Sequence, residues 1–261
     1  MNRRQVITGA AAMAALVSSE ARAMETGQTF LELKTWRLHN SSEGQAKRVS
    51  EYLETGLFPA LTRAGAKPVA AFGNLIGQDG PYQVTLVQYA SLAMMQDVLT
   101  KLAADEAHEK ALAQLSAGGG SPFVRLESTI LRSLTVMPEA VVPTDAASRP
   151  ARIFELRTYE SQSMTALKKK VGMFNGGEIG VFQRLGMRPV FIGEAIAGPR
   201  MPCITYMLSY DNLDGREKHW QAFSADPEWK KISAPVELKD AEIVGNISNV
   251  MLRPLPFSPV R

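Results

Sequence analysis

Hydrophobic and polar side chains alternate over residues 29–38, and several of these residues are β-branched or aromatic. This period of two predicts a β-strand. A capping-box sequence, Ser-Glu-Gly-Gln at 42–45, comes next, and a helix is predicted from there to about Arg63. Its apolar stripe consists of Val49, Leu53, Leu57 and Leu61. Gly65 is then placed to end the helix in a left-handed conformation.

Two more strands are predicted over residues 67–77 and 82–90, joined by a Gln-Asp-Gly-Pro turn at 78–81. Residues 92–115 have a helical pattern, three glycines at 118–120 end it, and residues 123–134 form a last strand. The resulting order, strand-helix-strand-strand-helix-strand, is that of the ferredoxin-like unit.

The same pattern occurs a second time in the chain. Leu-Glu-Leu-Lys-Thr-Trp at 31–36 is matched by Phe-Glu-Leu-Arg-Thr-Tyr at 154–159, and Arg-Ala-Gly-Ala-Lys-Pro-Val at 63–69 by Arg-Leu-Gly-Met-Arg-Pro-Val at 184–190. In the second copy, an Asn-Gly-Gly sequence at 175–177 interrupts the first helix, and the closing strand is predicted over 241–252. The sequence therefore indicates an internal duplication.

We accordingly expect an α+β fold made of two tandem ferredoxin-like βαββαβ units, which form an intramolecular, pseudo-dimeric α+β barrel. A sheet covered by helices on one face needs a partner for its other face, and the second copy supplies it. The expected domains are 24–135 and 151–255, with a linker at 136–150. We expect the leucine-bearing faces of the strands to meet the helices. The faces that carry Glu32 and Lys34, or Glu155 and Arg157, would lie between the sheets.

The N-terminus has the features of a secretory signal. Two adjacent arginines, Arg3 and Arg4, precede a short apolar stretch, and Ala-Arg-Ala at 21–23 fits a signal-peptidase site. We predict a twin-arginine signal peptide over residues 1–23, cleavage between Ala23 and Met24, and a periplasmic or secreted protein. The apolar stretch is too short to be a stable membrane anchor, since a bilayer span needs about 20 residues.

Composition narrows the chemistry. The 261 residues carry a net charge of +3, which gives no reason to expect a nucleic-acid partner. One cysteine and three histidines exclude a disulfide framework and leave little material for a metal centre. We predict no metal and no cofactor.

Three motifs in the second copy are similar to those of a known family. The Ile-Phe-Glu-Leu-Arg-Thr-Tyr sequence at 153–159, His-Trp at 219–220 and Ala-Asp-Pro-Glu-Trp at 225–229 resemble the NIPSNAP family. The resemblance implies a dimeric α+β barrel fold, in a group that includes cofactor-free monooxygenases and isomerases. The family itself carries no agreed reaction.

The sharpest polar set is Glu155 and Arg157, with Glu32 and Lys34 as their copies. Recurrence in both halves favours an ion pair that locks the two sheets together. The alternative is a catalytic pair in which the carboxylate acts as a general base beside an anion-binding arginine.

Other residues are weaker candidates. Tyr159 and His219 join Glu155 and Arg157 as catalytic candidates, and Tyr89, Tyr210 and Trp220 are candidates for ligand binding, although packing explains the aromatic residues as well. The lysine run at 168–170 is interpreted as a solvated helix face, with an anionic partner as the alternative.

Two functions remain open from the sequence. One is an exported module that binds a small molecule or a protein partner, without turnover. The other is a cofactor-independent monooxygenase or isomerase that acts on a small aromatic or lipophilic substrate, an analogy that rests on the fold. Homo-oligomerisation is compatible with both.

Overall fold

The computed structural model describes residues 27–117, 119–143 and 150–261. The predicted signal peptide and its cleavage point between Ala23 and Met24 lie outside these residues, as do residues 144–149 of the predicted linker. Within the described part of the chain, no helix is long and apolar enough to cross a membrane.

The first half contains the predicted βαββαβ order, with both helical segments divided. Its elements are β1 (Phe30–Arg37), α2 (Gln45–Tyr52), a π-helical turn (Leu53–Leu57), α3 (Phe58–Ala64), β2 (Lys67–Ile76), β3 (Tyr82–Tyr89), α4 (Leu92–Ala103), α5 (Glu106–Ala117) and β4 (Arg125–Ser133). Gly65 ends α3 with a φ of 103°, as predicted. The predicted capping box does not form, because left-handed Gly44 stands at the N-cap position without a side-chain hydrogen bond.

The second half repeats this order. Its elements are β5 (Ile153–Glu160), α6 (Met164–Met173), a π-helical turn (Phe174–Glu178), α7 (Ile179–Arg184), β6 (Arg188–Ala197), β7 (Cys203–Tyr210), α8 (Leu213–Ala225), α9 (Pro227–Ile232), a 3₁₀ turn (Val236–Leu238), α10 (Asp240–Ile243) and β8 (Asn246–Pro254). The predicted interruption at 175–177 is the second π-helical turn, where Gly177 has a φ of 146°. The closing strand starts later than predicted, because 240–243 are helical.

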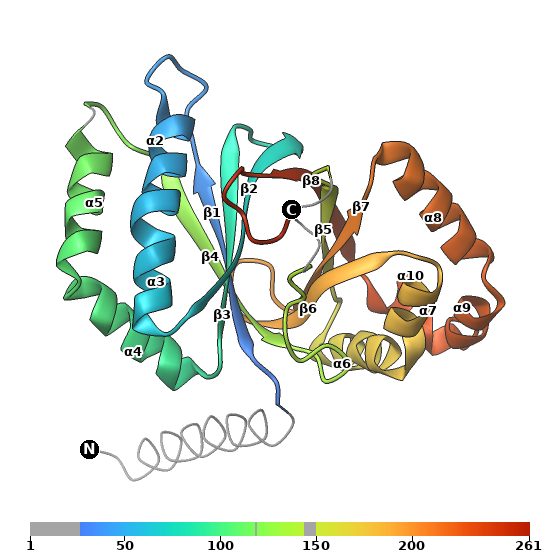
Figure 1. Ribbon diagram of the computed structural model, residues 1–261. Helices are drawn as coiled ribbons and strands as arrows, with labels where there is room; N and C mark the ends of the chain where they lie inside the picture. The colour runs from blue at the N-terminus through green and yellow to red at the C-terminus, as the bar shows by residue number, and fades with distance from the viewer. Residues whose placement is uncertain (1–26, 118, 144–149) are drawn as a thin grey trace, which may run out of the picture.

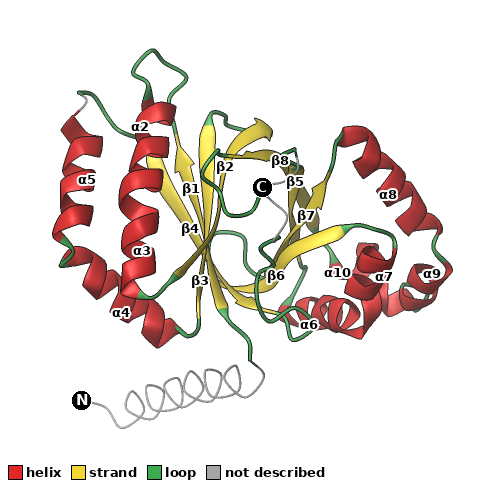
Figure 2. Ribbon diagram, viewed as in Figure 1, coloured by secondary structure: helices red, strands yellow, loops and turns green. Residues whose placement is uncertain are grey.

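The described strands close into one antiparallel barrel in the order β1-β3-β2-β8-β5-β7-β6-β4. Each half keeps the ferredoxin-like order, and the halves join where β2 pairs with β8 and β4 pairs with β6. Helices α2–α5 cover one side of the barrel and α6–α10 cover the other (Figures 1 and 2). The predicted α+β class and intramolecular barrel are confirmed.

The predicted assignment of the two strand faces is wrong. Leu31 and Leu33 belong to the core cluster inside the barrel, together with Phe154 and Leu252 from the other half. Glu155 instead contacts helix α8, since Trp220 donates to its carboxylate. Alternation along a strand predicts two faces but does not say which one meets the helices, because both faces are buried here. The helices supply polar partners for the carboxylate, and the opposite half of the barrel supplies leucines.

Two chain segments close one end of the barrel. Val141 donates its backbone N–H to Val190 near the start of β6, and Val260 does the same to Val69 near the start of β2. Val260 and Ala140 pack into the core cluster inside the barrel. Because β2 and β6 start at this end, the β2–β3 and β6–β7 turns lie at the opposite, open end.

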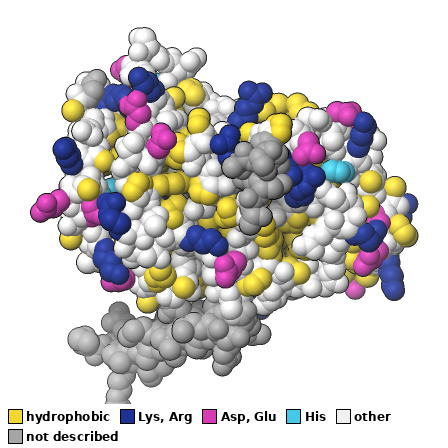
Figure 3. All heavy atoms as spheres, in the orientation of Figure 1, with side chains coloured by type: hydrophobic (Ala, Val, Ile, Leu, Met, Phe, Trp, Pro, Cys, Tyr) yellow, Lys and Arg dark blue, Asp and Glu magenta, His cyan; other side chains and the backbone are white. Residues whose placement is uncertain are grey.

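Charges on the outside are mixed. On the face shown in Figure 3, basic and acidic side chains are interspersed instead of gathered by sign, in keeping with a net charge of only +3.

Candidate functional site

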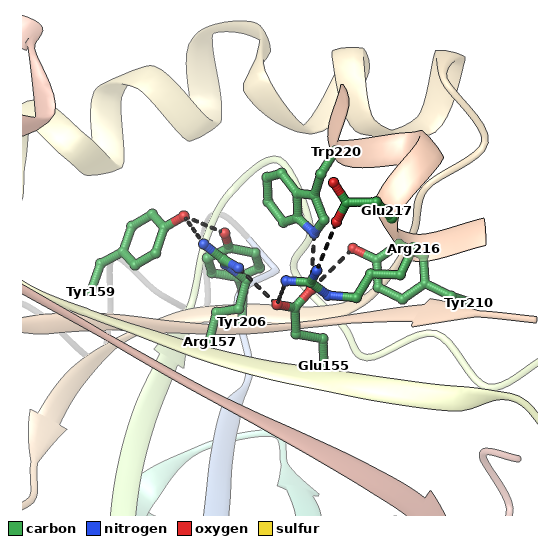
Figure 4. Close-up of polar contacts among 8 residues, drawn as sticks. All are labelled: Glu155, Arg157, Tyr159, Tyr206, Tyr210, Arg216, Glu217 and Trp220. Atoms are coloured by element: carbon green, nitrogen blue, oxygen red, sulfur yellow. Dashed lines mark hydrogen bonds and ion pairs between the residues drawn. The ribbon is translucent and has the colours of Figure 1, made fainter. Parts of the chain in front are cut away.

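A polar cluster fills the space between the sheet and the helices of the second half, and Glu155 is its centre (Figure 4). Its carboxylate accepts hydrogen bonds from Arg157 at 2.7 Å and Arg216 at 2.6 Å, from Trp220 at 3.0 Å and from Tyr210 at 3.3 Å. The Glu155 side chain is fully buried. These four donors saturate the carboxylate.

The charge of Glu155 is stabilised by this arrangement. Burial by itself raises the pKa of Glu155, but the hydrogen bond from Arg216, the charge of Arg157 and the hydrogen bond from Trp220 outweigh it, so the pKa lies below the ordinary carboxyl value. A general base that works near neutral pH needs the opposite shift. The geometry therefore favours a structural carboxylate.

Arg157 is held by aromatic groups as well as by the ion pair. Its Nη2 donates to the Tyr159 hydroxyl at 3.0 Å, and its guanidinium lies 4.3 Å from the Trp220 ring centroid. The Tyr206 hydroxyl donates to Tyr159 at 2.8 Å. Burial alone would lower the pKa of Arg157, but Tyr206, Tyr159 and Glu155 raise it, so the group stays charged.

A second buried ion pair adjoins this cluster. Lys170 of α6 and Glu178 of the π-helical turn approach to 3.1 Å, and their side chains are 1% and 2% exposed. The Lys170 ammonium also lies 5.3 Å from the Tyr159 ring centroid. The prediction of a solvated lysine face is thus wrong for Lys170, although Lys168 is exposed.

The first half contains a reduced copy of the cluster. Lys34 pairs with Glu32 at 3.0 Å, and the Tyr89 hydroxyl donates to the same carboxylate at 3.3 Å, as Tyr210 does to Glu155. Ser128 supplies a third contact at 2.8 Å. Each of the two ion pairs, Glu32–Lys34 and Glu155–Arg157, therefore lies within its own half, on the face that the helices cover. The predicted lock between the two sheets is not what these pairs form.

The remaining sequence candidates have different surroundings. His219 is half-buried and packs beside the Tyr210 ring with a centroid distance of 5.9 Å, and its Nδ1 finds no hydrogen-bond partner in the part of the chain that the structure describes. Phe223, the aromatic residue that follows Trp220 on α8, is buried in the core, as expected. Sequence reasoning missed Tyr206, Arg216, Lys170 and Glu178. Tyr206 and Arg216 lie four residues before Tyr210 and Trp220, so same-face spacing on β7 and α8 was the available signal.

A separate feature lies at the open end of the barrel, a cavity of about 730 Å³ that we call the barrel-mouth cavity. Its wall comes from both halves. The residues that line it are Leu33, Thr35, Arg37, Ile76, Gly77, Gln78, Asp79, Tyr82, Val84, Glu127, Thr129, Leu156, Thr158, Pro199, Arg200, Cys203, Thr205, Asn246, Ile247, Ser248, Asn249 and Val250.

Two cavity residues have unusual polar groups. Tyr82 is 4% exposed, and its hydroxyl has no hydrogen-bond partner among the described residues. A Cβ at Gly77 would collide with that oxygen, so a larger residue there would have to displace the Tyr82 hydroxyl. Burial raises the pKa of the Cys203 thiol to about 11, which keeps it protonated at neutral pH and makes it a weak nucleophile. Across the described ranges, no three His, Cys, Asp or Glu side chains are grouped to hold a metal ion.

Comparisons with known proteins agree with this architecture. The structure matches a candidate monooxygenase from Lactobacillus acidophilus with a TM-score of 0.56 and 10% identity, covering 87% of this chain and 94% of that one. A candidate monooxygenase from Fusobacterium nucleatum matches with a TM-score of 0.54 and 8% identity, covering 87% and 93%. At such identities the likeness shows the shared fold, the dimeric α+β barrel in a single chain.

The NIPSNAP family model matches residues 154–259, within the second half of the chain. An uncharacterised NIPSNAP-like domain protein from Burkholderia xenovorans has 20% identity and a TM-score of 0.38, covering 42% of this chain and 91% of its own. A search of curated proteins gives no significant match.

Proposed function

We propose that the protein is an exported binding protein that holds a small molecule in the barrel-mouth cavity and performs no turnover. The cavity itself is the observation that carries this proposal. Its volume of about 730 Å³ falls within the range of roughly 300–1,000 Å³ typical of ligand pockets. It stands at the open end of a barrel whose other end is closed and whose interior is packed.

The closed polar cluster supports binding over catalysis. An oxygenase or isomerase that worked through Glu155 and Arg157 would need one of these two groups to face its substrate. Glu155 and Arg157 are buried and bonded to each other, to Arg216 and to aromatic side chains, so neither faces a cavity. Export is supported by the sequence of residues 1–23, with Met24 as the expected first residue of the mature protein.

The experiment is native mass spectrometry of full-length protein expressed in a bacterium with a twin-arginine pathway and purified from the periplasm. We expect an intact mass that starts at Met24 and an additional mass from a retained small molecule. Retention of residues 1–23 would contradict the export proposal alone, which keeps the two parts of the proposal separable.

Blocking variants locate the ligand. Thr158→Trp places a large ring in the barrel-mouth cavity, and Thr35→Trp does so from the equivalent position of the first half. Thr100→Trp on the exposed surface of α4 is the matched control. Loss of the extra mass in a folded blocking variant, but not in the control, is expected. If both blocking variants fold and keep the full extra mass, or if no preparation contains or takes up a ligand, the binding proposal is wrong.

A further inference from the structure

The barrel-mouth cavity is layered, and strand register defines the layers. At the bottom, Leu33 on β1 lies beside Thr129 on β4, and Leu156 on β5 lies beside Val250 on β8. Below them the barrel is filled by fully buried residues such as Phe154. The cavity therefore has a mostly apolar floor.

A belt of hydroxyl groups lies one layer nearer to the mouth. Thr158 on β5 is in register with Thr205 on β7 and with Ser248 on β8, and the Thr158 and Thr205 hydroxyls are 3.1 Å apart. Since a strand rises by about 3.3 Å per residue, two residues separate the belt from the floor by roughly 7 Å.

Charge is distributed unequally around the mouth. On the first half, Arg37 is bound to Glu127 at 3.0 Å, so its charge is matched. On the second half, Arg200 donates to the Ser248 hydroxyl at 2.7 Å, and it forms no ion pair with a carboxylate among the residues that the structure describes. Because Ser248 belongs to the hydroxyl belt, this hydrogen bond brings the guanidinium to the level of the belt.

We infer that the ligand of the barrel-mouth cavity is a short-chain monocarboxylate. This inference rests on the proposed function and adds the chemical class. Arginine matches a carboxylate with two parallel hydrogen bonds, and the hydroxyls of Thr158 and Thr205 lie at the same level. A tail of about 7 Å, the depth set by the strand rise, then reaches the apolar floor at Leu33 and Leu156.

The test compares hexanoate with 1-hexanol, which keeps the tail and removes the charge. Binding to the mature protein is measured by isothermal titration calorimetry. Arg200→Gln is the test variant, and Arg63→Gln, an exposed arginine of α3 paired with Asp105, is the matched control. We expect wild type to bind hexanoate more tightly than hexanol. Loss of a charge-assisted hydrogen bond predicts about a tenfold weaker hexanoate affinity in Arg200→Gln, with hexanol binding unchanged.

The outcomes test the carboxylate class and the binding site separately. If hexanoate and hexanol bind equally, or if Arg200→Gln binds hexanoate as wild type does, the carboxylate class is wrong while the binding site stands. If neither probe binds, the carboxylate inference is overturned. The proposed function fails with it only if native mass spectrometry also finds no bound molecule.

Discussion

Removal of the Glu155 charge is the sharpest test of the polar cluster. In Glu155→Gln the buried Arg157 loses its counter-ion, since no second carboxylate is bonded to it in the cluster of Figure 4. Breaking a buried ion pair from one side costs about 3–5 kcal/mol. That is a large share of a typical stability of about 5–15 kcal/mol.

The structure also predicts an asymmetry between the two partners. In Arg157→Met the Glu155 carboxylate keeps its hydrogen bonds from Arg216, Trp220 and Tyr210. The loss is then close to that of one charge-assisted hydrogen bond, about 1.5–3 kcal/mol. The double variant should cost less than the sum of the two, because the second change no longer breaks a pair.

The assay is urea unfolding followed by tryptophan fluorescence, with the free energy of unfolding extrapolated to water. Glu32→Gln is the matched control in the same molecule. Its partner Lys34 is a quarter exposed, so the freed ammonium reaches water and the cost should be about 1 kcal/mol. Near-native stability of Glu155→Gln, or a larger cost for Arg157→Met than for Glu155→Gln, would refute the reasoning.

Three further predictions follow from buried groups. The pKa of Glu155 is lowered in the folded state from 4.5, so the contribution of its charge to stability is present above pH 4.5 and is lost as pH falls through the folded pKa. The difference in stability between wild type and Glu155→Gln, measured by unfolding at a series of acidic pH values, should therefore become smaller as pH falls. Lys170→Met should lower the free energy of unfolding by about 3–5 kcal/mol, and the double variant Lys170→Met/Glu178→Leu should lower it much less. Urea unfolding measures both, and an equal loss in the single and the double variant would contradict the buried pair. In thermal melts, Gly56→Ala should destabilise by about 1–3 kcal/mol, because its Cβ would lie 2.5 Å from an α5 side chain, whereas Gly180→Ala, with nothing within 4 Å, should be neutral or stabilising.

The architecture could be predicted from the sequence because the same order of strands and helices occurs in both copies of the duplication. The turn at 78–81 and the glycine at the end of α3 are local signals, and both occur where predicted. The helix predicted over 92–115 is instead two helices, since Asp105 accepts from the backbone N–H of His108 at the start of α5. Asp105 is of a residue type that favours helix caps, and it lies between the end of α4 and the start of α5.

The site was harder to predict because it depends on which buried face receives polar partners. Glu155 and Tyr210 were identified from their recurrence as Glu32 and Tyr89, but recurrence did not show that α8 brings Arg216 to the same carboxylate. The barrel-mouth cavity was not predicted at all. Its wall is assembled from short segments of both halves, and none of them has a sequence signal of its own.

Lys170 shows how a pattern rule fails in a specific way. Successive helical residues are about 100° apart, so three consecutive lysines span roughly 200° of the helix surface. An arc this wide can extend from the solvent-facing side of a helix to its buried side. Lys168 points to solvent while Lys170 reaches Glu178, at the π-helical turn.

The two halves differ in what their helices cover, and the NIPSNAP match lies in the second half. By the offset of 121 residues that relates 63–69 to 184–190, Lys170 corresponds to Val49 and Glu178 to Leu57, both apolar. The first half thus keeps an apolar helix–sheet layer and only the reduced Glu32 pair, whereas the second half buries several charges. The outer edges of β6 and β8 pair with β4 and β2 of the first half, so the second half by itself would leave both edges open. Both halves also build the barrel-mouth cavity, so a ligand held there would stabilise the junction between them.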